Sequence, residues 1–96
     1  MIWLSKDYTI TSEESAGFGC ADVMIIPHDK TKRGIIFEFK KAGRKKNKTL
    51  EEAARAAKNQ MIEKKYRRRM ETHGVSLITM IAIGFKGQEC LVLEVE

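Results

Sequence analysis

Two apolar segments decide the fold: Ala21–Pro27 (ADVMIIP) and Gly34–Lys41 (GIIFEFKK), separated by the wholly polar His28–Arg33. Both are rich in Ile, Val and Phe, which are enriched in β-strands. Pro27 lies at the end of its segment, where the missing backbone N–H does least harm to a strand. The pattern therefore predicts two strands that form a hairpin across a polar loop.

Three further strands are predicted on either side of this hairpin. Tyr8–Ser12 carries β-branched and aromatic residues, and Ser15–Gly19 follows with two glycines that can turn the chain tightly. Val75–Phe85 and Glu89–Val95 are apolar segments separated by the turn Lys86–Gln88, which contains a glycine. The sequence thus predicts three strands in its first half and two at its C-terminal end.

One long helix is predicted between these two groups of strands. Thr49–Glu52 matches the capping box that opens a helix, and the alanine-rich Ala53–Ala57 favours its continuation. The helix is expected to run past Tyr66 and to stop near Gly74. The predicted order is β-β-β-α-β-β, an α/β fold with a mixed or largely antiparallel sheet and one long helix packed on it.

The length and charge of the chain limit what it can be. Its 96 residues suffice for a single domain over residues 1–96, and 18 Lys and Arg against 13 Asp and Glu give a net charge of +5. A positive surplus favours a polyanionic partner such as nucleic acid. Two cysteines do not make a disulfide scaffold, and no apolar run reaches the ~20 residues needed to span a bilayer. We expect a cytoplasmic protein that does not insert into a membrane.

The helix can cover only one face of the predicted sheet. Its small and apolar residues recur at helical spacing and form one packing stripe: Leu50, Ala53, Ala54, Ala57 and Met61. The other face would need the N-terminal Ile2–Leu4 or a partner subunit as its cover. A homodimer or another homo-oligomer is therefore expected.

Three ionisable residues fall within the predicted hairpin strands. Because side chains alternate along a strand, Asp22 shares a face with Met24 and Ile26. Glu38 and Lys40 likewise share one face of the next strand. If paired residue numbers sum to 60, Asp22 lies opposite Glu38, whereas a sum of 62 places it opposite Lys40. Either register gathers the three side chains in one patch.

This patch has two interpretations. Two adjacent carboxylates repel unless a cation separates them, and Mg²⁺ accepts a site of few oxygen ligands completed by water and phosphate; Mn²⁺ is the second choice. Lys40 could then hold or activate the attacking water, which would make Asp22, Glu38 and Lys40 the catalytic residues of metal-assisted phosphodiester hydrolysis. The simpler interpretation is a surface ion pair worth less than ~1 kcal/mol.

Other polar residues are candidates for contact with nucleic acid. The segment after the patch is basic, and the residues predicted to bind a phosphate backbone are Lys41, Arg44, Lys45, Lys46 and Lys48. Gln60 lies on the packing stripe, where it is either a satisfied core amide or a substrate contact. Tyr66 lies about 240° further round the helix, so a packing role is favoured for it. The basic run from Lys64 to Arg69 is typical of solvated surface.

Asp22 and Glu38-Phe39-Lys40 resemble the motif of the PD-(D/E)XK nuclease superfamily, an aspartate followed by Glu-x-Lys on a mixed sheet. The sequence is most similar to the nuclease-like domains found C-terminal to bacterial and archaeal AAA-type ATPases. These carry a Gly-x-Gly turn shortly before the aspartate, as Gly17–Asp22 does, and a glutamine and a tyrosine in the following helix, as Gln60 and Tyr66 do. The likeness extends from about Ser12 to Phe85.

The resemblance implies a restriction-endonuclease-like fold and a nuclease acting on DNA. It implies that Asp22, Glu38 and the main-chain carbonyl of Phe39 bind Mg²⁺ and that Lys40 serves the water or the transition state. An ATPase partner is also implied. Such domains begin with a helix, which this sequence lacks, so an N-terminally truncated domain is expected. The alternative function is a catalytically inactive nucleic-acid-binding or assembly module derived from a nuclease.

Overall fold

The computed structural model describes residues 1–15, 20–43 and 49–95, and within these ranges it contains six strands and two helices. They are β1 (Ile2–Leu4), β2 (Tyr8–Ser15), β3 (Cys20–Pro27), β4 (Gly34–Lys41), α1 (Leu50–Glu63), α2 (Tyr66–Glu71), β5 (Ile78–Lys86) and β6 (Glu89–Val95). The predicted α/β class is confirmed. The predicted order is wrong in two respects, because a short strand precedes the expected ones and the helix is divided.

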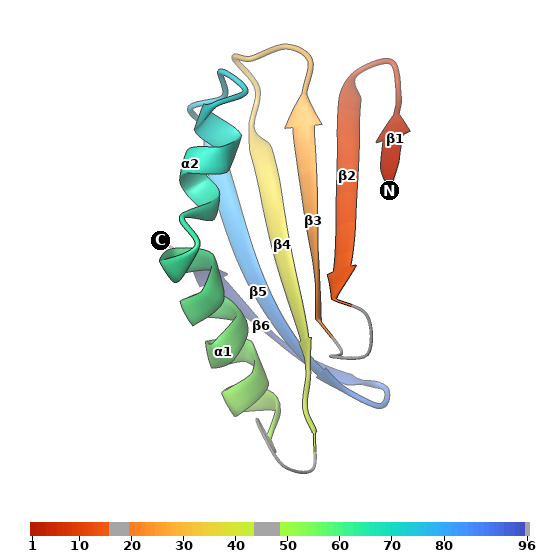
Figure 1. Cartoon of the computed structure of the whole chain (residues 1–96), viewed down its shortest axis with the longest axis vertical. Coiled ribbons are helices and arrows are strands. Elements are labelled where there is room, and N and C mark those ends of the chain that lie inside the picture. The colour runs from red at the N-terminus through yellow and green to blue at the C-terminus, as the bar shows by residue number, and fades with distance from the viewer. Residues whose placement is uncertain (16–19, 44–48, 96) are drawn as a thin grey trace.

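The strands form one mixed sheet whose spatial order equals their order along the chain (Figure 1). β1 to β4 make an antiparallel meander, β4 and β5 are parallel, and β5 and β6 are antiparallel. In the β3–β4 pair Asp22 lies opposite Glu38 and Met24 opposite Ile36. The register in which residue numbers sum to 60 is therefore correct.

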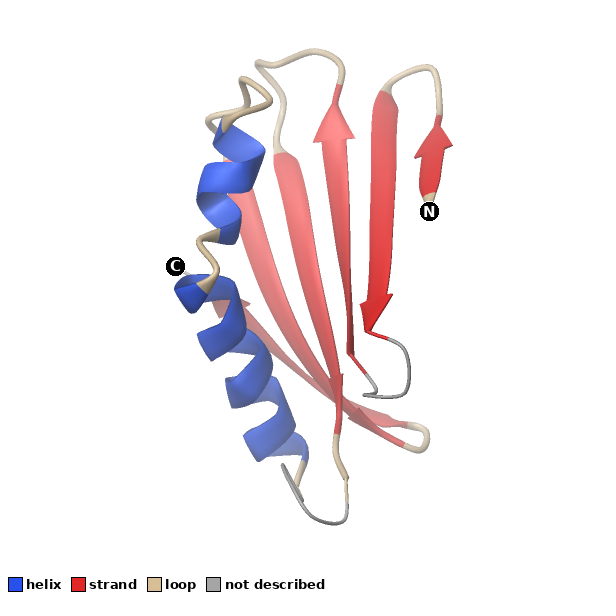
Figure 2. Ribbon diagram, in the orientation of Figure 1, coloured by secondary structure: helices blue, strands red, loops and turns tan. Residues whose placement is uncertain are grey.

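Both helices lie on the same side of the sheet (Figure 2). α1 packs across β4, β5 and β6, while β1 and β2 extend beyond the helices at the other edge (Figure 1). Gly84 on β5 makes the close approach possible, because a Cβ there would lie 2.5 Å from the Leu50 carbonyl oxygen and 2.6 Å from the Ala54 nitrogen. The capping prediction is confirmed, since the Thr49 side chain accepts a hydrogen bond from the Glu52 N–H.

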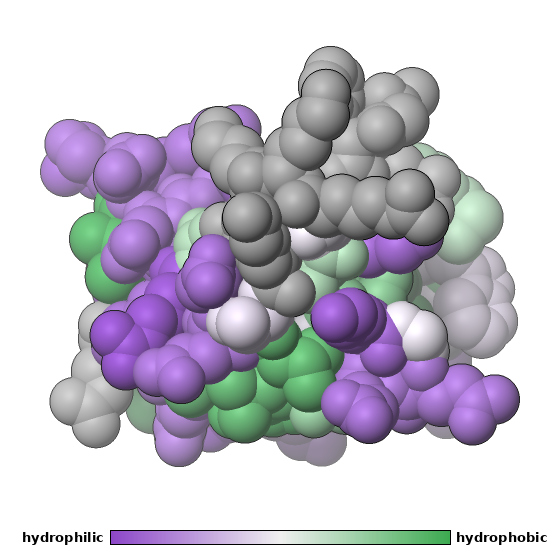
Figure 3. Space-filling model, turned by 90° about the horizontal axis from the view of Figure 1, so that it is seen from below, coloured by the Kyte–Doolittle hydropathy of each residue, from purple (hydrophilic) through white to green (hydrophobic). Residues whose placement is uncertain are grey.

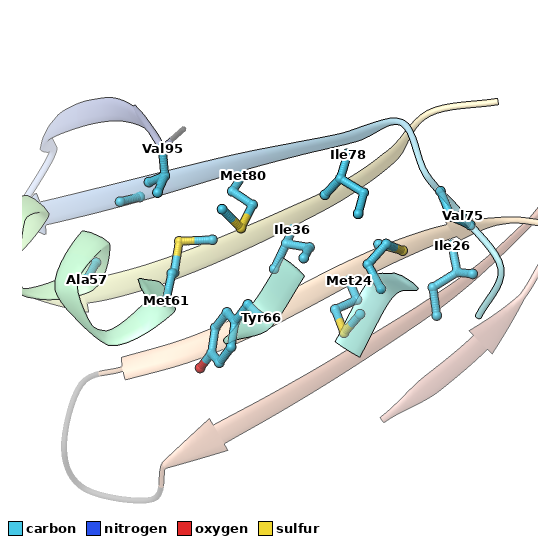
Figure 4. Close-up of a cluster of buried hydrophobic side chains, with 12 residues drawn as sticks. Met24, Ile26, Ile36, Ala57, Met61, Tyr66, Val75, Ile78, Met80 and Val95 are labelled. Atoms are coloured by element: carbon cyan, nitrogen blue, oxygen red, sulfur yellow. The ribbon is translucent and has the colours of Figure 1, made fainter. Parts of the chain in front are cut away.

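We call the face of the sheet on which the helices pack the covered face, and the opposite one the second face. The hydrophobic core fills the space between the helices and the covered face (Figure 4). Its buried members come from β3, β4, β5, β6, both helices and the segment before β5: Met24, Ile26, Ile36, Ala57, Met61, Tyr66, Met70, Val75, Ile78, Met80, Ala82 and Val95. Neither helix in the described ranges has the length and apolar character that crossing a membrane requires.

The prediction of a single long helix is wrong at Lys64 and Lys65. The Lys64 N–H still bonds back to Gln60, but Lys65 adopts left-handed dihedral angles of φ 53° and ψ 50°. A left-handed residue cannot continue a right-handed helix, so α1 ends and α2 restarts with a new rotational phase. The restart buries Tyr66 and Met70 against the sheet.

The N-terminal segment does not cover the second face of the sheet, so of the two expected covers, Ile2–Leu4 and a partner subunit, the first is wrong. Ile2 pairs with Thr11 and Leu4 with Thr9, which makes β1 an edge strand that widens the sheet. All three residues of β1 remain exposed. A three-residue strand is a common ending for a sheet, because a short edge offers few unpaired backbone groups to other chains.

The second face therefore has no helix or strand layer over it in the described ranges. Its centre consists of half-buried apolar side chains from β3, β4 and β5: Val23, Ile25, Ile35, Phe37, Phe39, Ile81 and Ile83. The rings of Phe37 and Phe39 stack with centroids 6.0 Å apart. Viewed from its lower end, the molecule exposes an area of hydrophobic side chains bordered by hydrophilic ones (Figure 3).

Candidate active site

Asp22 and Glu38 face each other across the β3–β4 pair on the covered side of the sheet. Period-two alternation puts Asp22 in line with the buried Met24, and Glu38 in line with the buried Ile36. Glu38 is 1% exposed, whereas the Asp22 side chain retains 14% exposure. The core thus ends at two adjacent carboxylates, one enclosed and one reached by solvent.

Tyr66 links the two carboxylates. Its hydroxyl donates to Glu38 Oε2 at 3.1 Å and lies 3.4 Å from Asp22 Oδ2. The new phase of α2 places the Tyr66 ring within the core cluster, and its oxygen points away from Ile36 (Figure 4). The sequence favoured a packing role for Tyr66; the residue packs, but it is also a polar member of the site.

Lys40 and Gln60 form the other half of the site. Lys40 Nζ donates to Gln60 Oε1 at 2.8 Å, and the nearby Gln60 amide opposes the rise that burial causes in the pKa of the Tyr66 hydroxyl. Gln60 therefore lies between Lys40 and the tyrosine that contacts both carboxylates. Gln60 has polar partners within the site, which explains how an amide is accommodated on the packing stripe.

Lys40 does not form the surface ion pair that the simpler interpretation of the patch predicted. Among the described residues, no ion pair within 4.0 Å joins Lys40 to either carboxylate. Within the described ranges, the cation found within 4.0 Å of Asp22 is Arg69, whose Nη1 lies 4.0 Å from Oδ2 while its guanidinium lies 4.9 Å from the centre of the Tyr66 ring. Arg69 is 42% exposed, so this pair is weakly attractive. The negative charge of the patch is only partly offset.

The protonation of Glu38 follows from its enclosure. Burial raises its pKa to about 7, the hydrogen bond from Tyr66 opposes the rise, and the neighbouring Asp22 adds to it. Burial likewise raises the pKa of Tyr66, so its phenol remains protonated and able to donate. A cation beside both carboxylates would favour the ionised form of Glu38.

The donor set fits a hard divalent ion. Asp22 and Glu38 supply carboxylate oxygens, and an ion such as Mg²⁺ binds through one or two carboxylates while it keeps several waters. In the part of the chain that the structure describes, no group of three or more His, Cys, Asp and Glu side chains gathers to hold a metal. The main chain of Phe39 lies between Glu38 and Lys40, and its role as a carbonyl ligand stays a prediction.

Glu13 is a site neighbour that the sequence did not reveal. It pairs with Asp22 on β2, so Glu13, Asp22 and Glu38 form one row across three adjacent strands. The strand was expected to end at Ser12, which left Glu13 in a turn. Its alternation with Thr11 and Thr9 was the pattern that could have extended the strand, because all three face the same side.

The predicted basic segment is only partly described. Lys41 is exposed at the end of β4, on the face opposite Lys40. Arg44, Lys45, Lys46 and Lys48 lie outside the described residues, as do Gly17 and Gly19 of the predicted turn. Their contact with nucleic acid stays a prediction, and so does that of Gln60.

Comparison with known proteins identifies the family of this arrangement. A family model described as the PD-(D/E)XK nuclease superfamily matches residues 1–95. No curated protein and no solved structure matches the chain. Nucleases of this superfamily generally use divalent metal ions. With the mixed sheet, and with Asp22, Glu38 and Lys40 together on one face, the match shows that the chain belongs to the PD-(D/E)XK nuclease superfamily.

Proposed function

We propose that this domain is a Mg²⁺-dependent nuclease that hydrolyses phosphodiester bonds in DNA. The observation that carries the proposal is the pairing of Asp22 with Glu38, with Lys40 held nearby by Gln60 instead of by a carboxylate. Two adjacent carboxylates that would hold a metal ion, and a lysine held apart from them, suit the stabilisation of charge that develops on phosphorus.

In this proposal Asp22, Glu38 and the Phe39 carbonyl would hold the metal ion. When bound, the ion would supply positive charge beside the scissile phosphate and lower the pKa of a coordinated water. Hydrolysis forms a bond between the water oxygen and phosphorus and breaks the bond from phosphorus to one sugar oxygen, which leaves with a proton.

Lys40 has three N–H donors, of which Gln60 engages one. The remaining donors orient the attacking water or bind a phosphate oxygen in the transition state. Gln60 and Tyr66 act as positioning residues, because Gln60 accepts a hydrogen bond from the Lys40 ammonium and Tyr66 donates one to the Glu38 carboxylate.

A second candidate function is a catalytically inactive module that binds nucleic acid or assembles with other proteins. The observation in its favour is the engagement of both carboxylates by the Tyr66 hydroxyl, which gives them a stable arrangement without a metal. In that case binding would weaken with salt but would not need Mg²⁺.

Metal titration separates the two functions. Isothermal calorimetry with Mg²⁺ and Mn²⁺, together with cleavage of a labelled DNA duplex and single strand, should be carried out on the parent and on the Asp22→Asn and Glu38→Gln variants. A nuclease predicts metal binding by the parent, at least tenfold weaker binding by either variant, and at least a hundredfold loss of cleavage.

Glu51→Gln provides the matched control. Glu51 is an exposed carboxylate that pairs with Arg55 on the surface of α1, so its neutralisation should leave metal binding and cleavage unchanged. Equal cleavage by the parent and both site variants would contradict the proposal. Salt-sensitive DNA binding with neither metal binding nor cleavage would favour the inactive module.

The partners of the domain are also proposals. A second copy of the chain is proposed as the cover of the second face, supported by its uncharged apolar centre, which complements itself better than it complements a charged surface. The ATPase partner rests on the sequence resemblance alone, and co-purification with an AAA-type ATPase would test it.

A further inference from the structure

A groove outside the carboxylate patch runs between α2 and the strands that the helices leave uncovered. Its volume is about 770 Å³. Ile2 on β1 and Thr11 and Glu13 on β2 form one side, and Met24 and Ile26 on β3 form the floor. The floor offers little accessible surface, because these two side chains are only 3% and 4% exposed. A ligand in the groove would therefore meet mainly its walls.

The α2 wall is strongly basic. Lys64, Lys65, Arg68 and Arg69 all line it, and Glu13 is the acidic residue among the lining side chains. Helical spacing explains the division of α2. At ~100° per residue, Arg68, Arg69 and Thr72 fall within one 100° arc, and Tyr66 and Met70 share a separate 40° arc that begins about 60° beyond Arg69. The left-handed Lys65 sets this phase, which turns the basic stripe toward the groove.

The groove and the carboxylate patch are connected by Arg69. This residue lines the groove and also approaches Asp22, with its guanidinium over the Tyr66 ring. A strand lying against the α2 wall would thus pass close to Asp22, the carboxylate that solvent reaches. The exposed Ile2 on the far side offers an apolar surface to sugars or bases.

We infer that the α2 wall, formed by Lys64, Lys65, Arg68 and Arg69, binds the phosphate backbone of a nucleic-acid strand and leads it to the carboxylate patch. The inference rests on the proposed function for what happens at that patch, but binding in the groove does not require catalysis. The inference assigns the basic run from Lys64 to Arg69 to a binding surface. The sequence alone had suggested that this run is merely solvated.

The test is binding of a fluorescent single-stranded oligonucleotide in EDTA, measured by anisotropy over a series of salt concentrations. The groove variant carries Lys64→Gln, Lys65→Gln and Arg68→Gln; Arg69 is left unchanged because it approaches Asp22. Its matched control removes three exposed lysines that do not line the groove, through Lys6→Gln, Lys32→Gln and Lys86→Gln. Both variants lose the same net charge.

The groove variant should bind at least about tenfold more weakly than the control, and its slope of log affinity against log salt should be smaller by about 2, since each phosphate contact on a single strand contributes about 0.7. The control should keep the parent slope. Equal losses in the two variants, or none in the groove variant, would overturn the inference.

Two further measurements locate the binding. In NMR spectra of the parent titrated with the oligonucleotide, amide shifts should concentrate at Thr11, Glu13 and Thr72, and shifts confined to other surfaces would contradict a groove site. A poly-glutamate peptide of equal charge should compete poorly. If it bound as tightly, with the same loss in the groove variant, the surface would be a site for acidic peptide and the inference would be wrong.

The failure of this inference is distinguishable from failure of the proposed nuclease. If the groove variant bound like the parent while metal-dependent cleavage remained, the groove assignment would fail and the nuclease would stand. If groove-dependent binding occurred without any cleavage, the groove would stand and the nuclease would fail.

Discussion

The two faces of the sheet are built from the same strands but meet different surroundings. On β4 the covered face presents Gly34, Ile36 and Glu38, which are all buried. The second face presents Ile35, Phe37 and Phe39, which are half-buried. One face thus packs on two helices and ends in the candidate active site. The other is equally apolar at its centre and carries no layer in the described residues.

The two faces of the same strands therefore have different requirements for their side chains. The covered face needs close packing, because Gly84 lies against the backbone of α1. It also needs precise polar contacts, because Glu38 is buried there and no cation pairs with it among the described residues. The second face needs only apolar area. We therefore expect substitutions on the covered face to change folding and chemistry, and substitutions on the second face to change association.

The largest effect is expected from Gly84→Ala on the covered face. A Cβ there would lie under 3.0 Å from two main-chain atoms of α1, which cannot move aside as a side chain could. We expect a loss of about 3 to 5 kcal/mol in the free energy of unfolding, measured by urea denaturation.

Gly87→Ala is the control for this substitution. Gly87 has φ +60° and no atom within 4 Å of a Cβ, so only backbone strain is added. Its cost should stay near 1 kcal/mol. Similar losses at the two positions would show that α1 does not contact β5 as closely as described.

Ile36→Ala and Ile35→Ala compare the two faces with one side-chain type. Ile36 is fully buried and should cost about 3 kcal/mol, and the half-buried Ile35 about 1 kcal/mol in the monomer. Urea denaturation at several protein concentrations sharpens the comparison. If the stability lost in Ile35→Ala increases with protein concentration, a second copy covers the second face. If Ile35→Ala and Ile36→Ala lost the same stability at every concentration, the difference between the faces would be contradicted.

The pH dependence of stability tests the buried charge of the covered face. The pKa of Glu38 rises from the ordinary 4.5 to about 7 on folding. Its stabilising contribution is therefore fully present below pH 4.5 and is lost as pH rises through about 7, by about 3 kcal/mol. Urea denaturation of the parent and of Glu38→Gln, without divalent metal, should show this loss in the parent alone. Parallel pH profiles would contradict the enclosed position of Glu38.

The smallest effect on unfolding is expected from Val92→Lys. Val92 is 54% exposed and pairs with Ile83, so it lies on the second face. The substitution should change the stability of the monomer by less than about 0.5 kcal/mol but convert the proposed dimer to a monomer in sedimentation velocity. Ile62→Lys, at a 52% exposed position on α1, should leave the association unchanged. A parent that sediments as a monomer would remove the dimer proposal.

Most of the sheet could be predicted from sequence because its strands are apolar segments rich in β-branched residues, separated by polar or glycine-containing turns. The Asp22–Glu38 register was one of two that the residues allowed, and polar placement alone could not choose between them. β1 was missed as a strand because three residues provide no periodicity, and β2 was ended early at Ser12 because the polar residues after it are typical of a turn.

The helix break hid the rest of the site. Nothing in Lys64-Lys65 marks a left-handed residue, which is usually glycine or asparagine, so the phase of a continuous helix was carried through to Tyr66. In that phase Tyr66 and Gln60 fall on different sides. The restart at Lys65 turns Tyr66 toward the carboxylate patch, while Gln60 at the end of α1 contacts Lys40, a tertiary outcome that local propensity does not encode.

The order of strands in the sheet also has a consequence for how fast the protein can fold. Every antiparallel pair joins strands that are neighbours along the chain, so each can close over a short loop. The parallel β4–β5 pair joins residues 44 positions apart, as Gly34 and Ile78 are, with both helices between them. Because closing that segment has the greatest entropic cost, we expect the docking of β5 beside β4 to limit the folding rate. The same step completes the wall against which Glu38 is enclosed.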